Sequence, residues 1–284
     1  MPSSPDRVYV HVGAPKTGTT YFQDRLALNR RSLADHDIHY LSSSPVADPT
    51  TFQFRAALDL MGQDWGGNPG HADGSWDRFA RLARRRHGSV ILSHEILATG
   101  RPWVVKRLRD SLDHAEVHIV YTARDLGRQI PAAWQESIKQ GRRWSYRRFL
   151  RKTQNGRAWF ARAFDLPDVL SRWGEGLPPE QVHLVTVPAP GHSDKGELFR
   201  RMCEAVGIDP AWAPRDSSRL NRSMGMAETQ LLRRLNVELN TTPRGADNEH
   251  THVVRGLLAE QLLASREDVR PVLMPESMYD WALE

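Results

Sequence analysis

The chain has 284 residues, of which 39% are apolar and 26% charged, and its 39 lysines and arginines against 34 acidic residues give a net charge of +5. This length and apolar content allow one substantial hydrophobic core, and no run approaches the ~20 consecutive apolar residues of a membrane span. A single cysteine, Cys203, excludes an internal disulfide framework, and residues 1–7 lack an apolar signal-peptide region, so we expect a cytoplasmic protein.

Short apolar, β-branched runs predict the strands of a sheet. They occupy residues 8–12, 38–41, 90–92, 117–121 and 182–187. Segments with helical periodicity, such as 21–33 and 76–86, separate most of them. Because strands that alternate with helices form parallel sheets covered on both faces, the expected fold is α/β, with a mostly parallel five-stranded sheet flanked by helices.

The strand pattern stops after about residue 195, and apolar periodicity then predicts helices. These cover residues 198–206, 227–239 and 253–265, and Cys203 lies in the first as apolar filler. No linker or repeat interrupts the chain, so we expect a single domain over 1–284, with an α/β core at 1–195 and a helical C-terminal part at 196–284. The glycine-rich stretch 48–75 is expected to be irregular, either a lid or acceptor loop or a surface insertion.

The stretch HVGAPKTGTT, residues 11–20, joins the first predicted strand to a helix, which is the setting of a phosphate-binding loop. In the triphosphate-binding loop G-x-x-x-x-G-K-[ST], the lysine directly follows the second glycine. Gly13 and Gly18 keep the glycine spacing, but Thr19 occupies the lysine position and Lys16 lies inside the loop. The amides of the first helical turn, the helix dipole and Lys16 would together bind an anion that needs neither the reach nor the magnesium ion of a kinase site.

The segment GAPKTGTT resembles the 5′-phosphosulfate loop, P-K-[SAT]-G-[ST]-[ST], of the sulfotransferases that use 3′-phosphoadenosine 5′-phosphosulfate (PAPS). The resemblance implies a P-loop-like sulfotransferase fold without a metal. It also implies that the donor's phosphosulfate is bound by Pro15, Lys16, Thr17, Gly18, Thr19 and Thr20. Lys16 would lie near the bridging oxygen, where stabilising the charge that accumulates as the sulfuryl group departs lowers the barrier most.

The resemblance also implies a second anion site for the 3′-phosphate of the donor. Sulfotransferases carry an arginine after the fourth strand, which Arg124 matches, and a serine eight residues later, where this chain has Ala132. Arg128 and, in a late loop, Arg222 are further candidates. The alternative for Arg124 is a structural role at the strand end, paired with Asp125 or a carbonyl.

Transfer to an alcohol or phenol requires a proton acceptor near the attacking oxygen. The third predicted strand leads into His94 and Glu95. In cytosolic sulfotransferases this strand ends in [ST]-H with histidine as the base, which Ser93-His94 matches, whereas other branches use glutamate, which keeps Glu95 a candidate. Because side chains alternate along a strand, we expect one of the two to face the site. Alternatively, His94 and Glu95 are a structural histidine and a helix-capping acid.

The resemblance therefore implies transfer of the sulfuryl group from PAPS to a hydroxyl of a small molecule, glycoside or lipid. The cation-rich segment 141–152 predicts a solvated amphipathic helix, and no nucleic-acid-binding motif accompanies it. Two alternatives stay open. One is a nucleotide-dependent kinase, and the other is a nucleotide-binding protein without catalytic activity, which Ala132 and the absence of a late R-K-G loop would favour.

Overall fold

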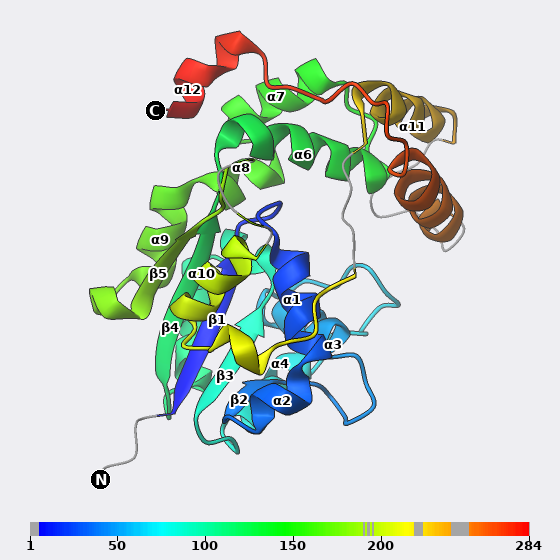
Figure 1. Cartoon of the computed structure of the whole chain (residues 1–284). Helices are drawn as coiled ribbons and strands as arrows, with labels where there is room; N and C mark the ends of the chain where they lie inside the picture. The colour runs from blue at the N-terminus through cyan, green and yellow to red at the C-terminus, as the bar shows by residue number, and fades with distance from the viewer. Residues whose placement is uncertain are drawn as a thin grey trace. The chain divides into compact units, whose positions relative to one another are not determined.

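The predicted strands form one five-stranded sheet in the computed structural model of the chain (Figure 1). They are β1 (Arg7–Gly13), β2 (Ile38–Tyr40), β3 (Ser89–Ser93), β4 (Glu116–Ala123) and β5 (Val182–Thr186). Their order across the sheet is β2-β3-β1-β4-β5, and each pairing is parallel. The expected α/β fold, with a parallel sheet flanked by helices, is confirmed.

The structure describes residues 6–189, 191, 194, 196–218, 224–239 and 250–283, excluding the side chains of 250–252 and 283. Arg222, a predicted phosphate ligand, lies outside the described residues. The chain divides into two compact units. The first comprises Met1–Arg124 and Arg162–Arg219, and the second comprises Asp125–Ala161 and Leu220–Glu284.

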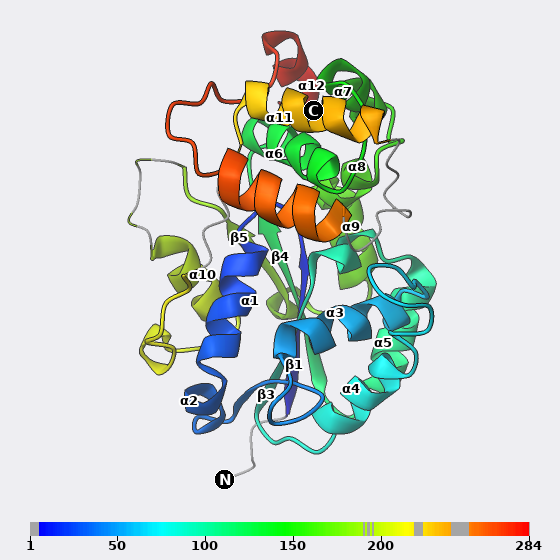
Figure 2. The same cartoon turned by 90° about the vertical axis from the view of Figure 1, so that its right-hand side faces the viewer.

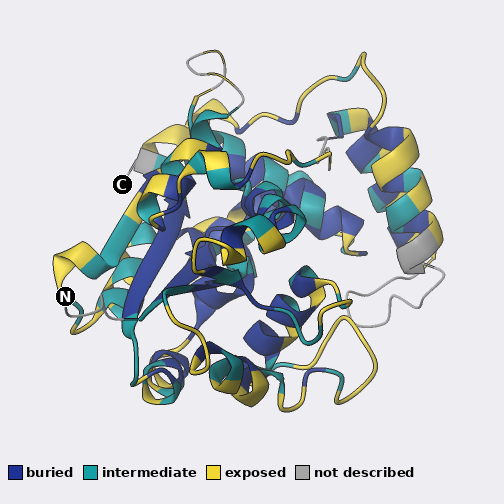
Figure 3. Cartoon of the chain, turned by 60° about the horizontal axis from the view of Figure 1, so that its bottom comes forward, coloured by how far each residue is buried: buried dark blue, intermediate teal, exposed yellow. Residues whose placement is uncertain are grey.

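The first unit contains the sheet and the helices around it. They are α1 (Thr19–Leu28), α2 (Arg30–Ala34), α3 (Pro49–Leu60), α4 (Ser75–Ala83), η1 (Glu95–Thr99), α5 (Pro102–Ser111), α9 (Leu166–Gly174), η2 (Pro179–Gln181), α10 (Glu197–Ala205) and η3 (Pro210–Trp212). The central strands are buried along most of their length because helices cover them (Figure 3).

Helices α1 and α10 share one hydrophobic core with the sheet (Figure 2). Phe22 of α1 and Phe199 of α10 pack in this core with Val120 of β4. Cys203 is fully buried in the same core, and burial raises the pKa of its thiol to about 12. The prediction that Cys203 is apolar filler is confirmed.

Helix α3 corrects the expectation that residues 48–75 are irregular. The carboxylate of Asp48 accepts hydrogen bonds from the amides of Thr50 and Thr51, at 3.1 and 3.2 Å, and Pro49 opens the first turn. Phe52 and Ala56, four residues apart, are both buried. The start signal and the apolar spacing were both present in the sequence, but the glycines after residue 61 obscured them.

The second unit is helical. It contains α6 (Leu126–Lys139), α7 (Tyr146–Gln154), α11 (Met226–Glu238), the π-helix η4 (His250–Leu263), η5 (Glu276–Met278) and α12 (Tyr279–Leu283), while α8 (Trp159–Phe164) spans the boundary between the units. Helix α7 is shorter than the expected 141–152, and Trp144 precedes it with Arg142 and Lys152 over its ring, 4.5 and 4.8 Å from the ring centre. Among the described residues, none of the helices combines the length and apolar character needed to cross a bilayer.

Candidate functional site

The loop between β1 and α1 has the backbone of an anion-binding turn. Lys16 adopts a left-handed conformation with φ of 67°, which non-glycine residues rarely adopt, and Gly18 follows with φ of 90° as the N-cap of α1. Among the described residues, no side chain caps this helix. The amides of its first turn, at Thr19 and Thr20, therefore belong to a helix start that can accept an anion.

Threonine side chains attach this loop to β4. Thr17 Oγ1 donates to the Ala14 carbonyl at 2.6 Å and also contacts Thr122 Oγ1. Thr122 Oγ1 donates to the Gly13 carbonyl at 2.9 Å, and the Ala14 amide donates to the Thr122 carbonyl at 3.0 Å. The loop is thus fixed at the carboxyl end of the central strands, where parallel sheets bind their ligands.

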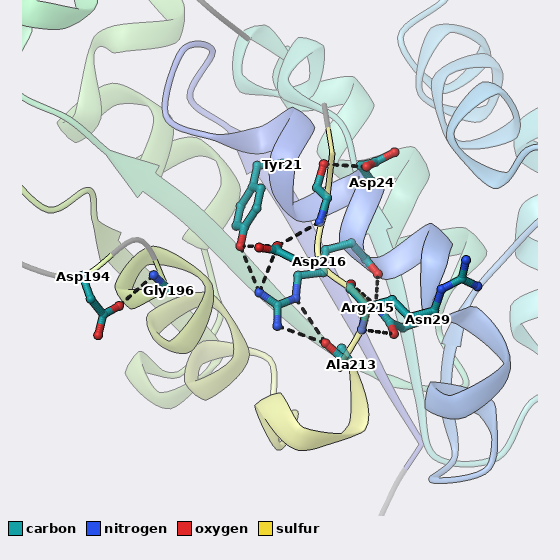
Figure 4. A network of polar contacts seen from close by, with 10 residues as sticks. Tyr21, Asp24, Asn29, Asp194, Gly196, Ala213, Arg215 and Asp216 are labelled. Carbon is teal, nitrogen blue, oxygen red and sulfur yellow. Dashed lines mark hydrogen bonds and ion pairs between the residues drawn. The ribbon is translucent and has the colours of Figure 1, made fainter. Parts of the chain in front are cut away.

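Helix α1 is held on its outer side by residues 213–217 (Figure 4). Tyr21 Oη donates to Asp216 at 2.8 Å, Asn29 Nδ2 donates to the Arg215 carbonyl at 2.7 Å, and Ser217 Oγ donates to Asp24. These bonds restrict the helix whose first turn closes the loop.

Arg124 lies beside the loop, at the end of β4. Its Nη1 donates to the carbonyl of Lys16 at 3.0 Å. This contact matches the structural alternative considered for Arg124, in which it binds a carbonyl. It also brings a guanidinium next to the predicted phosphosulfate site.

Glu95 packs directly against the loop. A Cβ added to Gly13 would lie 3.2 Å from Glu95 Cα, so the absence of a side chain at Gly13, whose φ is 118°, permits the approach. Gln23 Nε2 donates to Glu95 Oε2 at 3.4 Å. Burial acts to raise the pKa of Glu95, but the positive charge that His94 carries when protonated, a backbone amide and Lys16 outweigh it and hold that pKa below its ordinary value. Glu95 is therefore a carboxylate at neutral pH, within the field of Lys16.

His94 is engaged differently. Its ring stacks on Phe54 at 5.0 Å, and its Nδ1 accepts the amide hydrogen of Ile96 at 3.3 Å. Burial lowers the pKa of His94, against the opposing effect of Glu95, so the ring is neutral at neutral pH. A neutral imidazole that accepts at Nδ1 carries its proton on Nε2, so neither nitrogen of His94 is ready to accept another.

Strand alternation does not decide which of these two residues faces the site. Strand β3 ends at Ser93, and His94 caps the 3₁₀ helix η1 that begins at Glu95. Both residues therefore lie beyond the strand. The contacts of Gly13 and Phe54, and not the pleat of the strand, separate their environments.

A cavity of about 320 Å³ lies between α3 and the glycine-rich segment after it. Its lining consists of Thr51, Phe54, Arg55, Gly66, Gly67, Asn68 and His71. Phe54 connects it to the site, because the same ring stacks on His94, and Trp65 packs edge-on against Phe54 at 5.2 Å. The lining combines the Phe54 ring with four polar side chains, and small-molecule sites use such polar groups to fix the orientation of a ligand. Sequence reasoning missed this cavity because it missed α3.

The remaining candidates for the 3′-phosphate belong to the second unit. Arg128 forms an ion pair with Asp125, the residue that caps α6 by accepting the Arg128 amide hydrogen at 2.9 Å. Ala132 lies within α6. Ser137, which is out of register with the serine of the resembled family, donates its hydroxyl to the Trp134 carbonyl at 2.7 Å. The structure thus brings Arg124 to the loop and shows Arg128 engaged by a carboxylate.

Sequence reasoning also missed a buried polar group under the loop, formed by His11, Gln23, Ser93 and Thr122. The available signal was polar residues at the carboxyl ends of otherwise apolar strands. Within the described part of the chain, no group of three or more histidine, cysteine, aspartate or glutamate residues could hold a metal ion. Neither models of known protein families nor the curated proteins contain a match to this chain.

Proposed function

We propose that this protein is a PAPS-dependent sulfotransferase in which residues 15–20 bind the phosphosulfate of the donor and Glu95 is the general base. One observation carries the proposal. A carboxylate and the loop that holds Lys16 meet at the carboxyl end of β1, where Gly13 lets Glu95 pack against the loop. An anion site next to a proton acceptor is the arrangement that transfer of an anionic group to a hydroxyl requires.

The residues of the loop fit a single phosphosulfate group. The first-turn amides of α1, the hydroxyls of Thr19 and Thr20 and the ammonium of Lys16 supply donors and positive charge. Bound PAPS would supply an activated sulfuryl group. Lys16 would stabilise the charge on the phosphate that leaves, and Arg124, beside the loop, is the proposed ligand of the 3′-phosphate.

Glu95 is the proposed base because its pKa keeps it ionised, whereas the Nδ1 lone pair of His94 is occupied by the Ile96 amide. Glu95 would take the proton of the acceptor hydroxyl. His94 would orient the wall formed by Phe54, against which the acceptor would bind in the cavity beside α3. The acceptor would be a small molecule, glycoside or lipid with a free hydroxyl.

A nucleotide-binding protein without catalytic activity is the second candidate. The specific observation in its favour is the Arg128–Asp125 ion pair together with Ala132 in the serine position, which leave Arg124 as the proposed 3′-phosphate ligand among the described residues. Such a protein would bind the nucleotide and transfer nothing.

Calorimetry with adenosine 3′,5′-bisphosphate (PAP), followed by transfer of labelled sulfate from PAPS to a panel of hydroxylated acceptors, tests these proposals. We expect PAP to bind the wild type and not Lys16→Ala, whose turnover should fall roughly 100- to 1000-fold. Lys106→Ala, on α5 in an exposed ion pair with Asp110, is the matched control and should change neither.

The alternatives give different results in the same assays. Magnesium-dependent turnover of ATP without PAP binding would identify a kinase and refute the proposal. PAP binding that depends on Lys16, with no transfer to any acceptor, would favour the inactive binding protein.

A further inference from the structure

His11 occupies the carboxyl end of β1, at the centre of the sheet and directly under the loop. Its side chain is fully buried. In the sheet register His11 lies opposite Ser93 of β3 and Val120 of β4, and its carbonyl accepts the amide hydrogen of His94 at 3.1 Å. The function proposed above gives this residue no role.

Both ring nitrogens of His11 contact the neighbouring strands. Nδ1 lies 2.7 Å from Ser93 Oγ, and Nε2 lies 3.3 Å from Thr122 Oγ1. Ser93 immediately precedes His94 and Glu95, while Thr122 contacts Thr17 and bonds the Gly13 carbonyl of the loop. One imidazole therefore connects the segment that carries the proposed base with the loop that carries Lys16.

The neighbours of the ring decide which nitrogen carries the proton. Burial lowers the pKa of His11 to about 4, so the ring is neutral at neutral pH. Thr122 Oγ1 has one hydrogen, and when it donates this hydrogen to the Gly13 carbonyl at 2.9 Å it accepts from His11 Nε2–H. With the proton on Nε2, Nδ1 accepts the hydrogen of Ser93 Oγ, 2.7 Å away.

These bonds form a chain with a single direction. It runs from Ser93 through His11 to Thr122 and ends on the Gly13 carbonyl. Reversing the tautomer would set the lone pair of Nε2 against that of Thr122 Oγ1 or leave the Gly13 carbonyl without the Thr122 hydrogen.

We propose that His11 is the positioning residue of the site, and that its neutral Nε2–H tautomer sets the distance between Glu95 and the phosphosulfate loop. The proposal rests on the proposed function for its effect on turnover, but the tautomer itself does not depend on any activity. His11 touches neither donor nor acceptor in this scheme. It acts through Ser93 on the Glu95 side and through Thr122 on the loop side.

The tautomer can be measured directly on the wild-type protein. Nitrogen–proton correlation spectra of the assigned His11 imidazole should show the proton on Nε2 and an unprotonated Nδ1 at neutral pH. A proton on Nδ1, or a doubly protonated ring, would overturn the proposal whether or not the protein transfers sulfate.

Two substitutions of His11 separate the contact that Nδ1 makes with Ser93 from the contact that Nε2 makes with Thr122. In His11→Asn the amide oxygen reaches the position of Nδ1 and can accept from Ser93, whereas in His11→Gln the amide nitrogen reaches the position of Nε2 and can donate to Thr122. We expect His11→Gln to keep PAP affinity within about threefold of wild type and to lose at least tenfold in kcat. His11→Asn should lose at least tenfold in PAP affinity and keep kcat at saturating PAPS within about threefold.

His118→Asn and His118→Gln are the controls for a general loss of sheet stability. His118 is a buried histidine on β4 of the same sheet, and its Nδ1 is 2.9 Å from His183 Nε2. Neither control should separate affinity from kcat. His11 does not position the site if its two variants lose PAP affinity and kcat in proportion as the folded fraction falls. The same conclusion follows if they lose neither PAP affinity nor kcat. Failure of the wild type to bind PAP would instead refute the proposed function, and the tautomer measurement would still decide the role of the ring.

Discussion

Lowering the pH should lower the free energy of unfolding through His11, and the burial of this side chain determines by how much. Burial lowers the pKa of this side chain from 6.5 to about 4, with Glu95 opposing the shift and His94 adding to it. Below pH 6.5 the unfolded chain binds a proton at His11 that the folded chain does not, so the free energy of unfolding decreases as the pH falls from 6.5 to about 4. At about 1.4 kcal/mol per pKa unit, the full loss is about 3 kcal/mol.

Urea unfolding of the wild type and His11→Gln at several pH values between 7.5 and 4 measures this loss. The other histidines are present in both proteins, so the difference between the two curves reports His11 together with its coupling to Glu95 and His94. Above pH 6.5 the wild type should be more stable by a constant margin, because its ring bridges Ser93 and Thr122. That margin should shrink by about 3 kcal/mol on going to pH 4. Parallel curves over this range would refute the reasoning, because they would mean that His11 takes a proton as readily in the folded protein as in the unfolded chain.

Four substitutions in the site lead to further predictions. Glu95→Gln should abolish transfer and leave PAP binding intact, whereas His94→Asn should retain most of the turnover. Because the pKa of Glu95 is held below its ordinary value, the kcat of the wild type should stay level as the pH falls from 7.5 to about 5. A decline of kcat early in this range would point to a histidine base. Gly13→Ala should lower the free energy of unfolding, measured by urea titration, by at least about 2 kcal/mol. The reasons are the φ of 118° at Gly13 and the new Cβ, which would lie 3.2 Å from Glu95 Cα. A variant as stable as the wild type would contradict the observed packing. Phe54→Leu should raise the KM for the acceptor about fivefold, because about 1 kcal/mol of contact with the aromatic ring is lost, and should leave PAP affinity unchanged. An unchanged KM would exclude the cavity beside α3 as the acceptor site.

The sheet could be predicted from the sequence because its strands are short apolar, β-branched runs flanked by loops. The predicted start and end residues differ from the observed ones by one or two positions at most, as for β1 (Arg7–Gly13) against 8–12 and β5 (Val182–Thr186) against 182–187. The loop at 15–20 could be located for the same reason, since it follows the central strand directly.

What the sequence could not provide depended on contacts between distant residues. The different environments of His94 and Glu95 come from Phe54 and Gly13, which lie 40 or more residues away in the chain. The role of His11 depends on a pairing with Ser93 across 82 residues. Local periodicity carries no information about such pairs, so it could not tell which of the two candidate bases lies against the loop.

The burial of Cys203 gives the protein a natural reporter of local opening. It is the single cysteine of the chain, and it lies fully buried where α10 packs on the sheet. A thiol-reactive dye can reach it only when α10 moves away from the sheet, whose strands β1 and β4 hold the loop at residues 15–20. The rate of dye labelling therefore measures how often this face of the sheet is exposed, without any engineered cysteine, and a bound nucleotide that tightens α1 against the same core would slow it.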